Sequence, residues 1–150
     1  MSEKLTPKDY LMQIRKLRVL IDQREKELDR LREQTFSSAS GIDYSRIPVK
    51  GARRVGASFE QAANKAFDLT GEVAGLIDEY NDLRHKIIGE IQSLDRPEYM
   101  QVLYKRYVEE KHWEEISVEM GYSCDHIRHL HGWALHEFGK LMKNIKDNTQ

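Results

Sequence analysis

The sequence predicts an all-α protein, in which an antiparallel coiled-coil hairpin is followed by a helix-turn-helix domain. Apolar residues recur at alternating three- and four-residue steps through two long stretches. Near the C-terminus, a glycine separates two short amphipathic segments. We expect the hairpin in residues 1–95, with a connecting loop at 36–56, and the helix-turn-helix domain in residues 96–150. A length of 150 residues leaves room for one ordinary domain or two very small ones.

The first helical stretch covers residues 8–34. Thr6 is a suitable N-cap, and Pro7 fits the first turn, where its missing N–H is not needed. Arg24 is the one polar interruption of a narrow apolar seam, and such a seam packs against a single partner helix. The seam residues are Tyr10, Ile14, Leu17, Ile21, Leu28 and Leu31.

The second long stretch covers residues 57–95, with Ser58 as a candidate cap. Its seam keeps the same spacing, slips by one residue at Ile91 and resumes at Leu94. Gly71 and Gly75 fall off the seam, and the sequence gives no reason for them. The seam residues are Phe59, Ala62, Ala66, Leu69, Val73, Leu76, Tyr80, Leu83 and Ile87.

Charge favours pairing between these two helices. Residues 1–35 carry nine Lys/Arg and seven Asp/Glu, whereas residues 57–95 carry three and eight. Opposite net charges favour pairing of the two helices with each other over self-pairing. The connection is long enough to reverse the chain, so we predict an antiparallel hairpin. A parallel homodimer through the coiled coil is the alternative, because heptads do not specify whose helix fills the groove.

The connection between the helices begins as a flexible Ser/Gly run and ends in a basic cluster. One interpretation is a solvated loop. The other is a tip that contacts phosphate or a partner, which the apolar Tyr44, Ile47 and Val49 between the charges favour. The basic residues are Arg46, Lys50, Arg53 and Arg54.

Pro97 ends the long helix, because proline disfavours a helical residue before it and suits the start of a new helix. A short helix to Glu110 is expected next. Its expected buried residues are Met100, Leu103 and Tyr107.

Gly121 is expected at a tight turn between two helices. Such helices cross at about 100° only if the residue after the first helix tolerates a left-handed backbone. Ser117 is small where the helices would touch, Ser123 is a suitable N-cap, and the helix dipole favours Asp125 in the first turn. The apolar residues that flank the turn are Ile116, Met120, Tyr122, Ile127 and Leu130.

The last helix is expected to run to about Lys146 and to present one polar face to the major groove of DNA. Arg128 is suited to guanine or a phosphate, His129 to a base edge or a phosphate, and Gly132 to close backbone approach. A solvated helix face is the alternative, because the same elbow occurs in domains that bind only protein. The candidate DNA-binding residues are Ser123, Cys124, Asp125, Arg128, His129, Gly132 and His136.

Five of the six histidines lie in residues 96–150, so we expect any DNA binding to strengthen as the pH falls from about 8 to 6. The alternative is that most of them pack at the edge of the core or face away from DNA. These histidines are His112, His126, His129, His131 and His136.

Composition limits the other classes of function. The chain has 33% charged residues, a net charge of −1, 3 Pro and 9 Gly, which excludes collagen-like, proline-rich and strongly basic chains. Residues 96–150 carry eight Lys/Arg and nine Asp/Glu, which argues against strong non-specific DNA binding. The single cysteine cannot form an intrachain disulfide, and no apolar run approaches the roughly 18 residues of a membrane span. We therefore expect a cytoplasmic protein with no membrane contact.

A metal site and an enzymatic activity are both disfavoured. His126 and His129, three residues apart on a helix, could share an ion with Cys124 or His131, but a convincing third and fourth ligand are missing. The sequence contains no phosphate-binding Gly-rich loop, no His-Glu-x-x-His and no nucleophile elbow. We expect no metal, no cofactor and no catalysis.

Three segments resemble region four of the sigma factors. They are Val102 to Ile116, Met120-Gly121-Tyr122-Ser123 and Gly132-Trp133-Ala134-Leu135. With the linker Ser40-Gly41-Ile42-Asp43-Tyr44-Ser45, the chain resembles a family of small proteins from phages and prophages of Gram-positive bacteria. Its layout is similar to that of phage late-gene transcription activators of the ArpU and RinA types. The resemblance implies promoter-proximal binding of double-stranded DNA and contact with RNA polymerase.

The expected function is therefore that of a phage-derived, DNA-binding transcriptional regulator in the cytoplasm of a bacterial host. One alternative is a small terminase-like subunit for DNA packaging, since a helix-turn-helix and a coiled coil also occur together there. Another is a protein-interaction module that binds RNA polymerase without reading bases, which the acidic balance of residues 96–150 favours. The recognition segment Ser123 to Leu130 is less basic than is usual in sigma-like helices.

Overall fold

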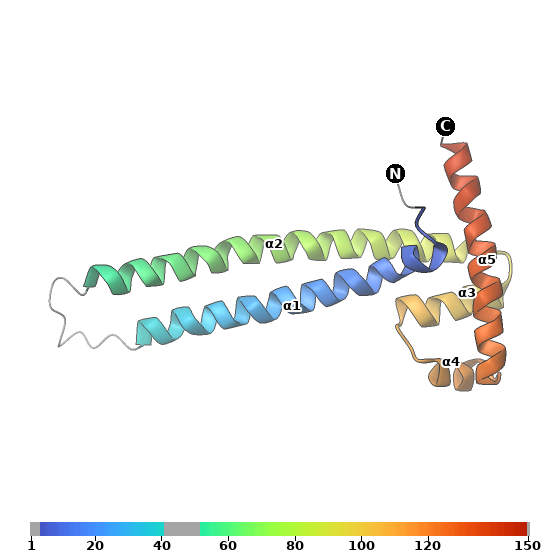
Figure 1. The fold of residues 1–150 in the computed structure, drawn as a ribbon, viewed down its shortest axis with the longest axis horizontal. Helices are drawn as coiled ribbons and strands as arrows, with labels where there is room; N and C mark the ends of the chain where they lie inside the picture. Colours follow the sequence, from blue (N-terminus) through green and yellow to red (C-terminus); the bar gives the residue numbers. More distant parts are fainter. Residues whose placement is uncertain (1–3, 41–51, 150) are drawn as a thin grey trace. The chain divides into compact units, whose positions relative to one another are not determined.

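The computed structural model describes residues 4–40 and 52–149, and the side chains of 4–37 and 58–149. Within these ranges the protein is built from helices and contains no strand, so the expected all-α class is confirmed (Figure 1). None of the described helices combines the length and the apolarity that crossing a membrane requires. The elements are α1 (Pro7–Ser40), α2 (Ala52–Gln92), α3 (Pro97–Leu103), the π-helical η1 (Tyr104–Val108), α4 (Trp113–Met120) and α5 (Cys124–Asn148).

The chain divides into two compact units. Unit 1 comprises Met1–Leu17 and Tyr80–Gln150, and unit 2 comprises Arg18–Glu79. The division does not follow the expected boundary at residue 95, because the first turns of α1 and the last turns of α2 belong to the same core as α3, α4 and α5.

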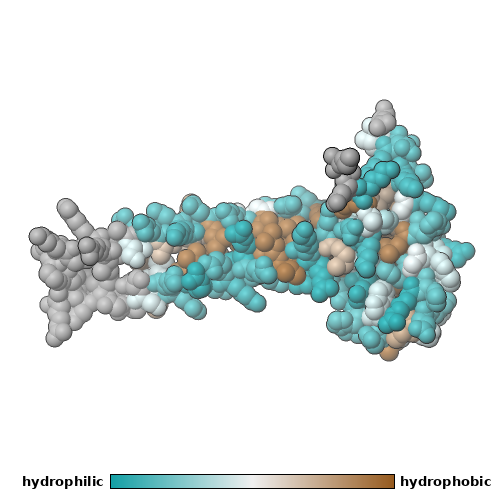
Figure 2. Space-filling model, viewed as in Figure 1, coloured by the Kyte–Doolittle hydropathy of each residue, from teal (hydrophilic) through white to brown (hydrophobic). Residues whose placement is uncertain are grey.

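Unit 2 is a pair of antiparallel helical segments (Figure 1). Leu28 of α1 packs in one buried cluster with Leu69 and Val73 of α2. Arg24, the polar residue of the seam, forms an ion pair with Glu72, with 3.6 Å between Nη1 and Oε2. On the face drawn in Figure 2, hydrophobic side chains gather between the two helices and hydrophilic ones cover the outside.

Unit 1 has a single core to which α1, α2, α3, α4 and α5 all contribute. Tyr10 connects three of these elements, because its ring stacks on Phe138 at 6.1 Å and its hydroxyl donates to Glu90 Oε1 at 2.6 Å. Burial and the bond to Glu90 raise the pKa of Tyr10. The largest fully buried side chains are Leu11, Ile14, Ile87, Ile91, Val102, Leu103, Ile116, Ile127 and Phe138.

The start of α1 follows the expected capping. The Asp9 N–H donates to Thr6 Oγ1 at 3.1 Å, and Pro7 begins the helix. Leu11 was absent from the expected seam but is fully buried. In unit 1 the helix packs against more than one neighbour, so its buried stripe is wider than a coiled-coil seam.

The ends of the two long helices differ from the prediction. The helix α1 runs to Ser40 instead of ending near residue 34, and α2 begins at Ala52. Ser58 therefore lies inside α2, and its expected role as a cap is wrong. Extending an existing helix requires little free energy, and Ala and Arg at 52–54 are good helix formers.

The expected basic cluster of the connection is largely undescribed. Arg46 and Lys50 lie outside the described residues. Arg53 and Arg54 lie in the first turn of α2, where only the backbone is described. Its role as a phosphate- or partner-contacting tip stays a prediction.

Pro97 separates α2 from α3 as expected. The helix α2 ends at Gln92, Arg96 is extended with φ −93° and ψ 123°, and Pro97 opens α3. The expected single helix to Glu110 is divided, because five residues after α3 form a π-helical turn. The π-helical turn ends at Val108, and two residues later Glu110 has a positive φ of 55°.

Candidate nucleic-acid interface

The turn between α4 and α5 depends on Gly121. This glycine has φ 72° and ψ 29°, and its N–H donates to Ser117 O at 3.0 Å. The Tyr122 N–H donates to the same carbonyl at 3.1 Å. A left-handed residue at this position closes α4 and turns the chain immediately into α5.

Ser123 and Asp125 begin α5 as expected. Ser123 Oγ accepts from the His126 N–H at 3.1 Å, and Ser123 is extended, with φ −67° and ψ 156°. Asp125 lies in the first turn, where the helix dipole favours an anion. The Ser123 side chain is therefore engaged in capping.

The inner side of the turn is apolar. Ile116 of α4 and Ile127 and Leu130 of α5 are buried in the core of unit 1. Met120 is only partly buried, and Tyr122 is 40% exposed. Because Ile127 and Leu130 are buried, the opposite face of α5 points away from the core.

Five of the seven candidate residues lie on this outward face and are exposed. They are Asp125, Arg128, His129, Gly132 and His136. Cys124 is half-buried at the start of α5. A Cβ at Gly132 would meet no atom within 4 Å, so no packing contact requires glycine there.

An aromatic row flanks this face and was missed as a site feature by the sequence reasoning. Trp133 is 52% exposed, and its ring lies 6.2 Å from the rings of His129 and His126. The ring of Tyr122 lies 4.7 Å from that of His126. The available signal was a tryptophan outside the buried stripe of α5.

The basic residues before the turn face an acidic partner. Lys105 Nζ lies 2.6 Å from Glu119 Oε2, and Lys111 Nζ lies 2.5 Å from Glu119 Oε1. These bonds lower the pKa of the Glu119 carboxyl. The bonds from Lys111 to Glu109 and Glu119 raise the pKa of that lysine. These two lysines are thus engaged within the protein.

His131 lies apart from the outward face and packs among aromatic side chains. Its Nε2 lies 2.6 Å from Tyr107 Oη, and its ring meets that of Trp113 edge-on at 4.7 Å. Arg106 lies over the Trp113 ring at 4.3 Å. Burial lowers the pKa of His131 to about 4, with smaller contributions from the charges of Arg106 and Lys8.

The expected contribution of His131 to a pH response between 8 and 6 is therefore wrong, because this imidazole stays neutral in that range. Burial also raises the pKa of Tyr107 to about 12, an effect that the Arg106 charge opposes. Among the described residues, no group of three or more His, Cys, Asp or Glu is arranged to hold a metal ion.

No family model matches the chain, and comparison with curated proteins and with solved structures finds no match.

Proposed function

We propose that this protein is a DNA-binding transcriptional regulator of phage origin that reads duplex DNA with the outward face of α5. The observation that carries the proposal is the tight turn at Gly121 followed by a capped helix with Arg128, His129 and Gly132 exposed on one side. This arrangement fits a helix-turn-helix, in which the second helix enters the major groove.

Arg128 is the residue on which base recognition is proposed to depend. It is exposed, it follows the N-terminal turn of α5, and a guanidinium can contact the O6 and N7 atoms of guanine together. His129 and the backbone at Gly132 lie beside it on the same face. Asp125 would then discriminate against close phosphates or accept a hydrogen bond from cytosine N4.

The experiment is selection of binding sites from a random duplex library with the full chain, followed by titration of the enriched duplex. Arg128→Ala is expected to weaken specific binding by about 1–3 kcal/mol while stability changes by less than about 0.5 kcal/mol. Arg32→Ala, an exposed arginine of unit 2, is the matched control and is expected to bind like the wild type. Failure to enrich any sequence, or equal affinity of Arg128→Ala, would contradict the proposal.

A second candidate function is supported by the exposed apolar side chains around the turn. Val118 is 81% exposed, and Trp133 and Tyr122 are also exposed. Exposed aromatic side chains are enriched in protein interfaces. A module that contacts RNA polymerase without reading bases would use this surface, and Trp133→Ala would then abolish polymerase binding while Arg128→Ala would not.

We also propose that the antiparallel segments of unit 2 come from one chain, folded as a coiled-coil hairpin. The Arg24–Glu72 pair and the Leu28, Leu69 and Val73 cluster support this pairing. The hairpin would serve as an arm for assembly or for a partner protein.

A further inference from the structure

The outward face of α5 continues towards the C-terminus well beyond Arg128, His129 and Gly132, the residues proposed to read bases. At about 100° per residue, positions 136, 140 and 143 fall within about 60° of the direction of Asp125. The face therefore begins with Arg128 and His129 and continues in its second half with lysines. The lysines of this half are Lys140, Lys143 and Lys146.

A groove of unit 1 runs along this second half. Lys4, Leu5 and Pro7 line one side, and α5 lines the other from Gly132 to Asp147. The N-terminal segment is held close to the helix, since a Cβ at Gly139 would lie 3.1 Å from Pro7 Cγ. The groove shares Gly132 and His136 with the candidate reading face, so the two surfaces are continuous.

The groove is basic although residues 96–150 carry nine Asp/Glu against eight Lys/Arg. Four lysines and His136 line it, against the single carboxylate of Asp147. Lys140 lies 3.3 Å from Glu137, whereas no described residue forms an ion pair with Lys4, Lys143 or Lys146. The helix dipole accounts for a lysine only in the last turn, at position 146, since its effect falls off within one turn.

We propose that this groove binds the sugar-phosphate backbone of the DNA whose bases the first half of α5 reads. The inference rests on the proposed function. At 1.5 Å per residue, Lys143 lies about 22 Å along the helix from Arg128. A B-DNA major groove is about 12 Å wide, so a helix that enters it at an angle with Arg128 at the bases carries this part of α5 over the flanking phosphates.

Lys4 and the lysines of α5 would then contact phosphates from two sides of the groove. These contacts supply the positive charge that the net balance of residues 96–150 lacks. Within the described part of unit 1, the proposed phosphate contacts thus gather on one face of α5 and on the segment beside it. Phosphate contacts of this kind fix the register of a protein on the duplex without carrying sequence information.

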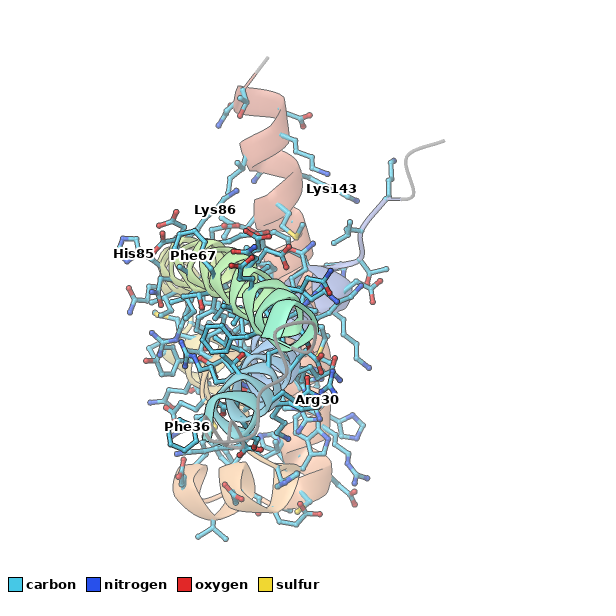
Figure 3. All side chains as sticks on the ribbon, turned by 90° about the vertical axis from the view of Figure 1, so that its left-hand side faces the viewer. Arg30, Phe36, Phe67, His85, Lys86 and Lys143 are labelled. Atoms are coloured by element: carbon cyan, nitrogen blue, oxygen red, sulfur yellow. The ribbon has the colours of Figure 1, made fainter. Side chains whose placement is uncertain are left out.

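The test measures how binding of the full chain to the enriched duplex depends on salt. Each phosphate contact contributes about 0.9 to the slope of log K against log salt. Lys143→Gln combined with Lys146→Gln is expected to reduce that slope by about 1.8. Lys65→Gln combined with Lys86→Gln removes the same charge from exposed positions of α2 and is expected to leave the slope unchanged. Figure 3 shows Lys143 on α5 and Lys86 on α2.

The outcomes separate this inference from the proposed function. A reduced slope for the α5 pair alone supports the inference. Equal slopes for all variants, with Arg128→Ala still defective, overturn the groove proposal and keep the proposed function; an acidic amphipathic peptide would then fit the groove chemistry. A wild-type protein that binds no duplex overturns both. Thermal unfolding of each variant, followed by circular dichroism, is the control for intact folding.

Discussion

Comparing the glycines of this chain distinguishes two reasons for a glycine, namely a left-handed backbone and a lack of room for a side chain. A Cβ added at Gly71, Gly75, Gly121 or Gly132 would meet no atom within 4 Å. Only Gly121 has a positive φ, 72°, and the other three lie within helices. The same substitution should therefore have opposite effects on stability at these positions.

Gly121→Ala is expected to lower the free energy of unfolding by roughly 1–2 kcal/mol, because an L side chain strains a left-handed residue. Gly75→Ala is expected to raise it by up to about 1 kcal/mol, because alanine is the better helix former. Urea titration of both variants measures the difference. Two changes of the same sign would contradict the account of the turn.

His131 gives a second prediction at this scale, in the pH dependence of stability. Its pKa is about 4 in the folded protein, below the ordinary value of 6.5, so the unfolded chain binds a proton first as the pH falls. The stability contribution is complete above about pH 6.5 and is lost progressively towards pH 4. Allowing for partial exposure, the loss is on the order of 1–2 kcal/mol.

The check compares the wild type with His131→Gln in urea unfolding at pH 7 and pH 4.5. The wild type should lose more stability than the variant over this interval. Loss of equal size in both proteins would show that other groups account for the acid sensitivity.

At the scale of elements, the turn at Gly121 and the caps Thr6 and Ser123 could be predicted from the sequence. The expected cap Ser58 was wrong, and the extent of packing could not be predicted. Pro97, Gly121 and Ser123 constrain their own backbone, so local chemistry is sufficient to predict them. The buried Leu11 and the π-helical turn at 104–108 depend on contacts between elements. No periodicity within one helix encodes such contacts.

The candidate site divides in the same way. The exposure of Arg128 and His129 was predictable, because the buried stripe of α5 determines which of its residues point outward. The aromatic contacts of His131 were not, since its partners Tyr107 and Trp113 come from η1 and α4. Side-chain partners far apart in sequence are the information that a periodic pattern lacks.

The pairing of α1 with α2 in unit 2 can be tested through its ion pair. With Arg24→Lys, a carbodiimide should join the new amine to the Glu72 carboxylate, because the native atoms lie 3.6 Å apart. In a mixture of isotope-labelled and unlabelled protein, the linked peptides should be all heavy or all light. Mixed peptides would show that the pairing is between chains.

At the scale of the whole molecule, unit 1 is assembled from segments distant in sequence. Ile14 of α1 and Ile87 and Ile91 of α2 are fully buried in the same core as Phe138 of α5. A small core of this kind has little stability to spare when part of it is removed. The C-terminal helices are therefore expected to depend on both ends of the long helices.

A fragment of residues 96–150 is accordingly expected to lack cooperative thermal unfolding, since the buried residues from α1 and α2 are missing. In the full chain, Ile14→Ala is expected to lower the free energy of unfolding of unit 1 by about 2–5 kcal/mol. Circular dichroism melting measures both effects. A fragment that unfolds cooperatively would place the domain boundary near residue 95 after all.

Figure 3 labels two phenylalanines of unit 2, Phe36 and Phe67. These side chains are 75% and 80% exposed. The two tryptophans of the chain, in contrast, both lie in unit 1. Trp113 is packed beside Arg106 and His131, whereas Trp133 is half in solvent next to the outward face of α5. Tryptophan emission therefore reports on unit 1, with a water-exposed, red-shifted component from one indole and a shielded component from the other. Iodide should selectively quench the water-exposed component, which comes from Trp133. A duplex bound along α5 should protect Trp133 from iodide, so the intrinsic fluorescence of the protein would report DNA binding.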